Sequence, residues 1–188
     1  MSEALEFLND LFAKAKKAGA DAADGHHVVS QSLSTSMRMG KREDLERSES
    51  LDMMLRVFIG QRQACVASSD TSAQAMEELV ERAVSMAKVA PEDPYCGLAP
   101  EDRLAKKWPD LDLFDDYEYD TEALYGIAAE TEEAALAVDG VTNSNGAGAG
   151  WSSAEVAIAT SHGFAGTYKS SSYSLSASVL AGEGTEME

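Results

Sequence analysis

The spacing of apolar residues predicts three helices. Apolar positions recur at three- and four-residue steps in residues 3–18, 70–88 and 120–135, and this period places them on one face of a helix. Either Asp70 or Ser72 can cap the second helix, because both side chains accept hydrogen bonds from backbone amides. Each helix is therefore expected to bury one side.

An alternation with a period of two predicts antiparallel strands. It runs through residues 28–39, 51–59 and 62–68, where one apolar face alternates with one polar face. Gly60 suits the first central position of a two-residue loop, so the second and third of these strands are expected to form a hairpin. Residues 40–50 are highly charged and show no apolar face. They are expected to form a connection.

A long irregular segment separates the first predicted helices and strands from a second series of a helix and strands. Residues 90–120 hold all four prolines and a dense run of acids, and a connection of this length is either functional or mobile. Three further strand-like runs follow the last helix, in residues 141–149, 151–161 and 164–181. The sequence predicts an α+β fold, mainly antiparallel sheet with about three helices, and a pseudo-repeat of one helix and three strands.

Composition restricts the class of function. The chain has 188 residues, of which 44% are hydrophobic, and a formal charge of −18. Binding to nucleic acid or anionic lipid needs clustered Lys and Arg, so neither is expected as a direct partner. The chain begins without a secretory signal and has no apolar run long enough to span a membrane. The isolated Cys65 and Cys96 favour reduced thiols, and we expect a cytoplasmic protein.

Residues that often carry chemistry form no recognised motif here. His26 and His27 are adjacent and His162 is distant, so none has the H-E-x-x-H spacing of a zinc site, and the pair is expected at an edge or in a loop. The glycines of residues 146–150 precede a strand rather than a helix, which favours close backbone approach over phosphate binding. Cys65 lies in an alternating strand and is expected to be buried.

Two polar segments also lack a catalytic pattern. The serines of residues 170–178 show no G-x-S-x-G elbow and are expected to line the solvent face of a strand. The acids of residues 110–120 lack the calcium-binding loop of an EF-hand and are expected to be a solvated loop. We therefore assign no catalytic residue, no metal ligand and no cofactor to this chain, and its substrate-binding residues stay unassigned.

Seven blocks of sequence carry a resemblance to a known family. They are ERSES (46–50), LRVFIGQRQA (55–64), SSD (68–70), ERAVSMAK (81–88), APEDPY (90–95), VTNSNGA (141–147) and TSHGFAG (160–166). Their order and spacing resemble the N-terminal region of the PmbA/TldD family, closest to the PmbA (TldE) branch. Members are much longer, so the resemblance implies that residues 1–188 are one N-terminal α+β domain of a longer PmbA-like protein.

The resemblance also implies a function. It implies a cytoplasmic peptidase system in which a TldD-like subunit binds zinc through an H-E-x-x-x-H motif, while its PmbA-like partner lacks the metal. This chain would then be non-catalytic, act on unfolded peptides, and pair with a TldD-like subunit or with itself. The family is also described as modulating DNA gyrase, and it is linked to microcin maturation and to antitoxin degradation. A regulatory module without proteolysis is therefore the alternative.

Overall fold

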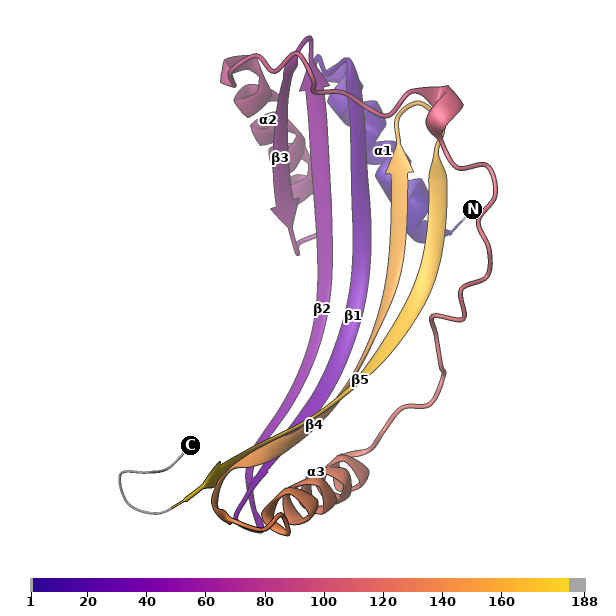
Figure 1. Cartoon of the computed structure of the whole chain (residues 1–188). Helices are drawn as coiled ribbons and strands as arrows, with labels where there is room; N and C mark the ends of the chain where they lie inside the picture. The colour runs from indigo at the N-terminus through magenta and orange to yellow at the C-terminus, as the bar shows by residue number, and fades with distance from the viewer. Residues whose placement is uncertain (1, 183–188) are drawn as a thin grey trace. The chain divides into compact units, whose positions relative to one another are not determined.

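The computed structural model describes residues 2–182 and has an α+β fold (Figure 1). Its elements are α1 (Glu3–Lys17), β1 (Ala22–Arg38), β2 (Lys41–Ile59), β3 (Arg62–Ser68), α2 (Ala73–Val89), the 3₁₀ turn η1 (Glu101–Arg103), α3 (Thr121–Leu136), β4 (Val141–Thr160) and β5 (Ala165–Ala181). The strands form one antiparallel sheet in the order β3-β2-β1-β4-β5. The predicted fold class is confirmed. None of the helices in residues 2–182 is long and apolar enough to cross a membrane.

The described chain divides into two compact units. Unit 1 contains the residues up to 29 together with 50–111 and 155–169, and unit 2 contains 30–49, 112–154 and the residues from 170 on. Four strands contribute a part to each unit, because β1, β2, β4 and β5 all cross a boundary between the two. Each unit has a hydrophobic core of its own.

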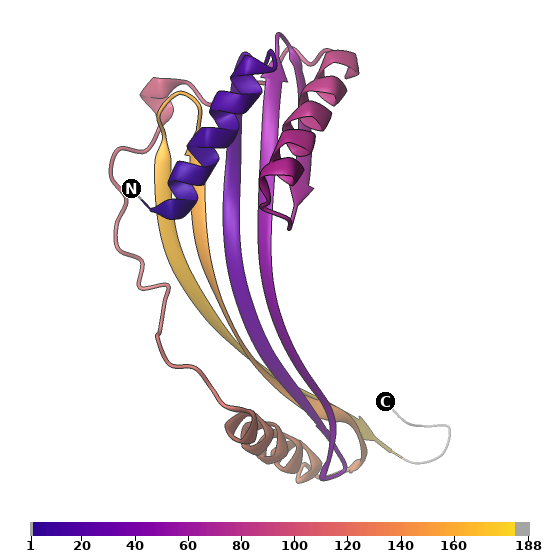
Figure 2. The same ribbon diagram turned by 180° about the vertical axis from the view of Figure 1, so that it is seen from behind.

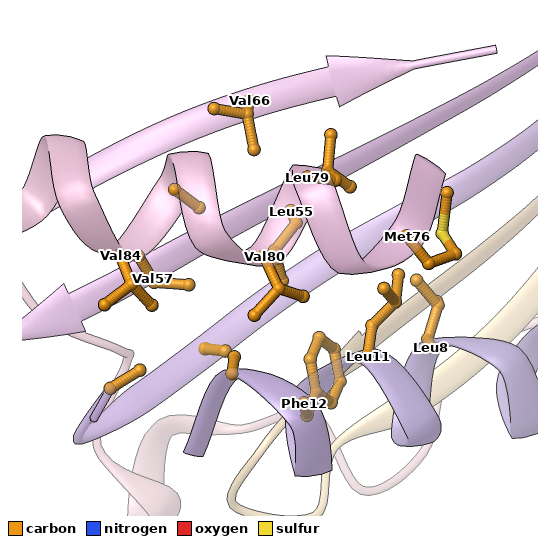
Figure 3. Close-up of a cluster of buried hydrophobic side chains, with 14 of the residues drawn as sticks. Leu8, Leu11, Phe12, Leu55, Val57, Val66, Met76, Leu79, Val80 and Val84 are labelled. Atoms are coloured by element: carbon orange, nitrogen blue, oxygen red, sulfur yellow. The ribbon is translucent and has the colours of Figure 1, made fainter. Parts of the chain in front are cut away.

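In unit 1, α1 and α2 pack on the same face of the sheet (Figure 2). The side chains of Ser2 and Ser72 cap these helices by accepting hydrogen bonds from the amides of Leu5 and Ala75, which satisfies donors that a helix start leaves open. Figure 3 shows side chains of both helices meeting those of β2 and β3. The largest fully buried members of this core are Leu8, Leu11, Met53, Leu55, Val57 and Leu79.

A glycine is required where β1 passes beneath α1. A Cβ at Gly25 would lie 2.6 Å from the carbonyl oxygen of Met54 and 3.3 Å from a methyl group of Leu8. We expect Gly25→Ala to lower the free energy of unfolding by about 2 kcal/mol, because the backbone oxygen cannot move aside as a flexible side chain would. Denaturant unfolding measures the loss. Gly126→Ala in α3 is the control, since nothing lies within 4 Å of its Cβ position; an equal loss in both variants would contradict the steric explanation.

In unit 2, α3 packs against β1 and β4. Asp120 caps the helix, its carboxylate accepting a 2.7 Å hydrogen bond from the amide of Ala123. The core between the helix and the strands consists of Leu33, Met37, Leu124, Tyr125, Ala128, Ala149 and Trp151. These residues follow the predicted helix stripe and alternate along both strands, so one face of this part of the sheet is covered.

Two sequence expectations about strands were wrong. Residues 41–50, expected to be a connection, form the first part of β2. All ten are exposed, so this part of the strand has no buried face and shows no apolar alternation. Residues 141–160 form one continuous strand rather than two runs, and the second half of the chain therefore has two strands after its helix. The predicted pseudo-repeat is absent from the described residues.

Candidate functional site

The strand β5 lies at one edge of the sheet, with β4 as its neighbour. The hydroxyl groups of Ser152 and Ser172 are 3.0 Å apart, and a Cβ at Gly150 would lie 2.8 Å from Oγ of Ser174. Trp151, which lies between Gly150 and Ser152 along β4, belongs to the core beneath α3. Because side chains alternate between the two faces of a sheet, Gly150, Ser152 and their neighbours Ser172 and Ser174 lie on the opposite, open face. The predicted solvent face of serines is confirmed for residues 172–178, which are all exposed.

The backbone on the outer side of β5 is available for pairing. The amide of Ser171 points away from β4, because it donates a 2.9 Å hydrogen bond to the carbonyl oxygen of Leu113. The backbone N–H and C=O groups of successive residues point alternately to the two sides of a strand. Those of Tyr173, Leu175 and Ala177 therefore point outward, as the amide of Ser171 does. Within residues 2–182, no hydrogen bond from outside the sheet reaches the backbone of Leu175 or Ala177. In the part of the chain that the structure describes, this stretch of β5 is an open edge.

The composition of this edge is unusual for an exposed strand. Residues 170–181 contain no charged residue and no proline, although 26% of the whole chain is charged. Natural sheets normally protect an exposed edge with Lys, Pro, a bulge or a covering segment, because free edges recruit other strands. Tyr173 and Leu175 are 45% and 57% exposed. The open part of β5 thus has the features of a surface that pairs with another chain.

One segment of the chain already lies against the start of this edge (Figure 1). We call residues 112–119 the strap. Its contacts with β5 include the Leu113–Ser171 hydrogen bond, a 2.9 Å hydrogen bond from the amide of Asp115 to Oγ of Ser171, and a 3.1 Å hydrogen bond from the hydroxyl of Tyr173 to the carbonyl oxygen of Tyr117. The rings of Tyr119 and Tyr173 also pack edge to face, with centroids 5.3 Å apart. Within residues 2–182, the strap therefore contacts β5 at Ser171 and Tyr173, and its hydrogen bonds do not reach Leu175 or Ala177.

A buried carboxylate fixes the nearby hairpin between β1 and β2. The carboxylate of Glu132 on α3 accepts hydrogen bonds of 2.8 Å and 2.9 Å from the amides of Met39 and Gly40, and one of 2.5 Å from the hydroxyl of Ser144. Burial disfavours the charge, but the hydrogen bonds from Gly40, Ser144 and Met39 outweigh it and hold the pKa of Glu132 below its ordinary value. The carboxylate joins α3, the hairpin and β4 in one cluster.

An exposed ion pair holds the start of α3 to β2. The guanidinium of Arg42 makes two hydrogen bonds to the carboxylate of Glu122, at 2.8 Å and 2.5 Å, and lies 4.4 Å from the ring centroid of Tyr125. The hydrogen bonds between the two side chains raise the pKa of Arg42 and lower that of Glu122. Because both groups are exposed, this pair orients the helix but adds little to stability.

In unit 1, an open groove of about 620 Å³ lies beside the turn between β4 and β5. His162 in this turn donates from Nε2 to the carbonyl oxygen of Ala99 at 2.8 Å, since a carbonyl can only accept, and its Nδ1 lies 2.8 Å from Oγ1 of Thr160. Trp108 packs near Phe164, with ring centroids 6.4 Å apart. Both nitrogens of His162 are thus used within the chain, where they tie residue 99 to the hairpin.

Comparison with known proteins identifies the family. The models for PmbA/TldA metallopeptidase domain 1 and for the PmbA/TldA metallopeptidase central domain match residues 27–87 and 114–188. The chain is 35% identical over 183 residues to the metalloprotease PmbA homolog of Haemophilus influenzae, which covers 97% of this chain and 40% of that protein. The chain belongs to the PmbA/TldD family.

Solved structures show the same fold in other PmbA/TldD-like proteins. A proposed modulator of DNA gyrase from Bacteroides thetaiotaomicron has a TM-score of 0.89 at 22% identity, covering all of this chain and 43% of that one. TldE from Thermococcus kodakarensis has a TM-score of 0.78 at 16% identity, covering 96% and 40%. The chain therefore spans less than half the length of the PmbA/TldD relatives that it matches.

The histidines of this PmbA/TldD chain do not form a metal site in the described residues. His26 and His27 lie within β1, the central strand of the sheet, rather than at an edge or in a loop as expected. As neighbours in a strand they point to opposite faces. His162 uses both nitrogens in the contacts described above. Residues 2–182 bring together no group of three or more His, Cys, Asp or Glu that could hold a metal ion. The donors do not fit a zinc ion.

Cys65 is exposed, so the prediction that it is buried was wrong. In β3, Ala64 and Val66 face the helices and are buried, and alternation turns Cys65 to the other side. Cys65 therefore lies on the opposite face of β3 from the one predicted. Gly146, by contrast, meets the expectation of close backbone approach: its φ is +119°, and a Cβ there would lie 3.0 Å from the carbonyl oxygen of Met37.

Glu132 was not among the residues singled out from the sequence. A signal was present, because Leu124, Ala128 and Glu132 are four residues apart and share the buried face of α3. A carboxylate in such a stripe needs hydrogen-bond donors when it is buried. The donors come from a hairpin more than ninety residues earlier in the chain, and no local pattern identifies them.

Proposed function

We propose that this chain is part of a PmbA-like, non-catalytic subunit of a zinc metallopeptidase, in which it presents a binding edge for unfolded polypeptide. The open, uncharged edge of β5 in a chain of the PmbA/TldD family is the observation that carries this proposal. A sheet edge binds an extended chain mainly through the main chain, so it accepts many sequences. That property suits an enzyme for unfolded substrates of varied sequence.

The chemistry is assigned to a second subunit. Hydrolysis of an amide bond needs an activated nucleophile and a group that stabilises the developing oxyanion, and a zinc ion supplies both in a metallopeptidase. The described residues offer no donor set that fits zinc. A TldD-like partner that carries the metal would complete the enzyme, and the fold shared with TldE supports this pairing. A cytoplasmic location is part of the same proposal.

A second candidate is a regulatory module without proteolysis. The similar protein from Bacteroides thetaiotaomicron is described as a proposed modulator of DNA gyrase, and the open edge of β5 would serve equally to hold a partner protein. The charge of −18 disfavours direct contact with DNA. In this case the partner would be a protein and no peptide bond would be cut.

Cleavage assays separate the two candidates. We expect the full-length protein to cleave an unfolded peptide only when it is mixed with a TldD-like subunit, and a chelator to abolish the activity. Mass spectrometry of the products gives the measurement, with each subunit assayed alone as the control. Chelator-sensitive turnover by the full-length protein alone would refute the non-catalytic role. Absence of turnover by the mixture would favour the regulatory module.

A further inference from the structure

We propose that the outer edge of β5, from Tyr173 to Val179, docks an extended segment of a partner polypeptide that carries positive charge. The inference builds on the proposed function, since it names the charge of the polypeptide and the place where it binds. It rests on the geometry of unit 2 alone. The test measures binding, which is independent of cleavage.

The strap shows that the edge accepts an extended backbone. Leu113 contacts Ser171 and Tyr117 contacts Tyr173, so the strap and β5 run in the same direction. The strap takes the outward amide of Ser171. Beyond Tyr173, the outward groups of Leu175, Ala177 and Val179 continue the same row. At about 3.3 Å per residue, this row matches a partner segment of about seven residues.

The side chains around the row leave room for a partner strand. On one face, Ser174 and Ser176 adjoin the glycines of β4, so no bulky group shields the backbone. On the other face, Tyr173 and Leu175 are exposed and can cover apolar side chains of a bound segment. A strand added here would place alternate side chains against a small polar face and an apolar face, which is the usual pattern of β-augmentation.

The negative charge beside this edge determines which kind of polypeptide segment binds there most favourably. The strap carries Asp115, Asp116 and Glu118, and residues 108–120 contain no Lys or Arg. Arg47 approaches Glu118 only at 3.7 Å and also pairs with Glu49. The potential beside the edge is therefore negative, which attracts a segment rich in Lys or Arg. A second copy of this chain is disfavoured, because it would bring another acidic strap and another charge of −18.

The binding test uses the full-length protein and two labelled nonapeptides. In both peptides Val and Thr alternate with a charged residue, which is Lys in one peptide and Glu in the other. Fluorescence anisotropy measures their binding. We expect the Lys peptide to bind and the Glu peptide to bind at least about tenfold more weakly, because like charges face each other at the strap. Added salt should weaken binding of the Lys peptide. Equal binding of the two peptides would overturn the proposal.

A proline at position 177 tests the edge itself. Ala177→Pro removes an outward N–H without removing a hydrogen bond to β4, whereas the control Ala177→Val keeps it. We expect about a tenfold loss of affinity in the proline variant, as for the loss of one buried hydrogen bond, and no loss in the valine variant. Unchanged affinity of the proline variant would overturn the proposal.

Hydrogen exchange tests the unmodified protein in case the proline variant does not fold. The amides of Leu175 and Ala177 should exchange quickly without peptide and slowly with the Lys peptide. Slow exchange without peptide, or a dimer that excludes the peptide, would show another occupant and overturn the proposal. Peptide binding without cleavage by the complete enzyme would support this inference while refuting the proposed function, so the two failures are distinguishable.

Discussion

The variant Glu132→Ala is expected to lower the free energy of unfolding by about 3–5 kcal/mol, because it leaves several buried donors without their charged acceptor. Glu132 is 2% exposed and accepts hydrogen bonds from Met39, Gly40 and Ser144. Fluorescence of Trp151, which is buried in the same core, follows the transition in denaturant. A Trp108→Phe background leaves it as the sole tryptophan.

The neighbouring residue Glu133 provides the control. It lies on the same helix and is exposed, so Glu133→Ala should change the stability by less than about 0.5 kcal/mol. Similar losses in both variants would show that helix propensity, rather than the buried carboxylate, causes the effect. Amide exchange at Met39 and Gly40 adds a local readout, which only the Glu132 variant should accelerate.

The stabilisation by Glu132 should also depend on pH. Its pKa is lowered in the folded protein, so its contribution is complete above the pKa of an unfolded glutamate, about 4.3. It is then lost as the pH falls through the lower pKa of the folded state. The difference in stability between the original chain and Glu132→Ala should therefore be largest near neutral pH and should narrow below about pH 4. A difference that grows in acid would contradict this prediction.

The second large effect is expected from Leu55→Ala. Leu55 is fully buried on β2, opposite Val66 of β3, in the core beneath α1 and α2. Truncation removes apolar contacts and leaves a cavity, and such a change in a protein core typically lowers the free energy of unfolding by about 2–5 kcal/mol. Denaturant unfolding followed by circular dichroism measures the loss.

The same strand offers a matched control for this variant. Leu45 is 54% exposed, so Leu45→Ala should change the stability by less than about 0.5 kcal/mol. If both leucine variants lost the same stability, β-sheet propensity and not core packing would be responsible. If neither lost stability, the core of unit 1 would have collapsed around the smaller residue.

Much of the fold could be predicted from the sequence because its signals are local. Apolar spacing identified all three helices, and Ser72, which caps α2, was one of the two candidates named for that helix. The hairpin between β2 and β3 followed from Gly60, which has a φ of +57°. These features depend on residues within a few positions of one another, and the energies that fix them are local as well.

The rest depends on contacts between distant residues. The strand order that puts β5 at an edge cannot be inferred from its alternation of Ser with apolar residues, which an inner strand can also show. Residues 41–50 pair as a strand without burying either face, so the hydrophobic pattern that identifies strands is missing. The site was predictable only as a row of serines facing solvent. That this row lies on an open edge could be recognised only once the strands and segments beside β5 were known.

The interleaving of the two units has a consequence for how the chain can be divided. The family models match two consecutive blocks of sequence, before and after residue 100, whereas the polypeptide passes between the compact units at 29/30, 49/50, 111/112, 154/155 and 169/170. No single cut of the chain releases either unit whole. Each core closes only after segments more than a hundred residues apart have met, which is the pattern of contacts associated with slow folding. Duplication or exchange of one sequence block during evolution would therefore transfer only a part of each unit, and not a unit that folds on its own.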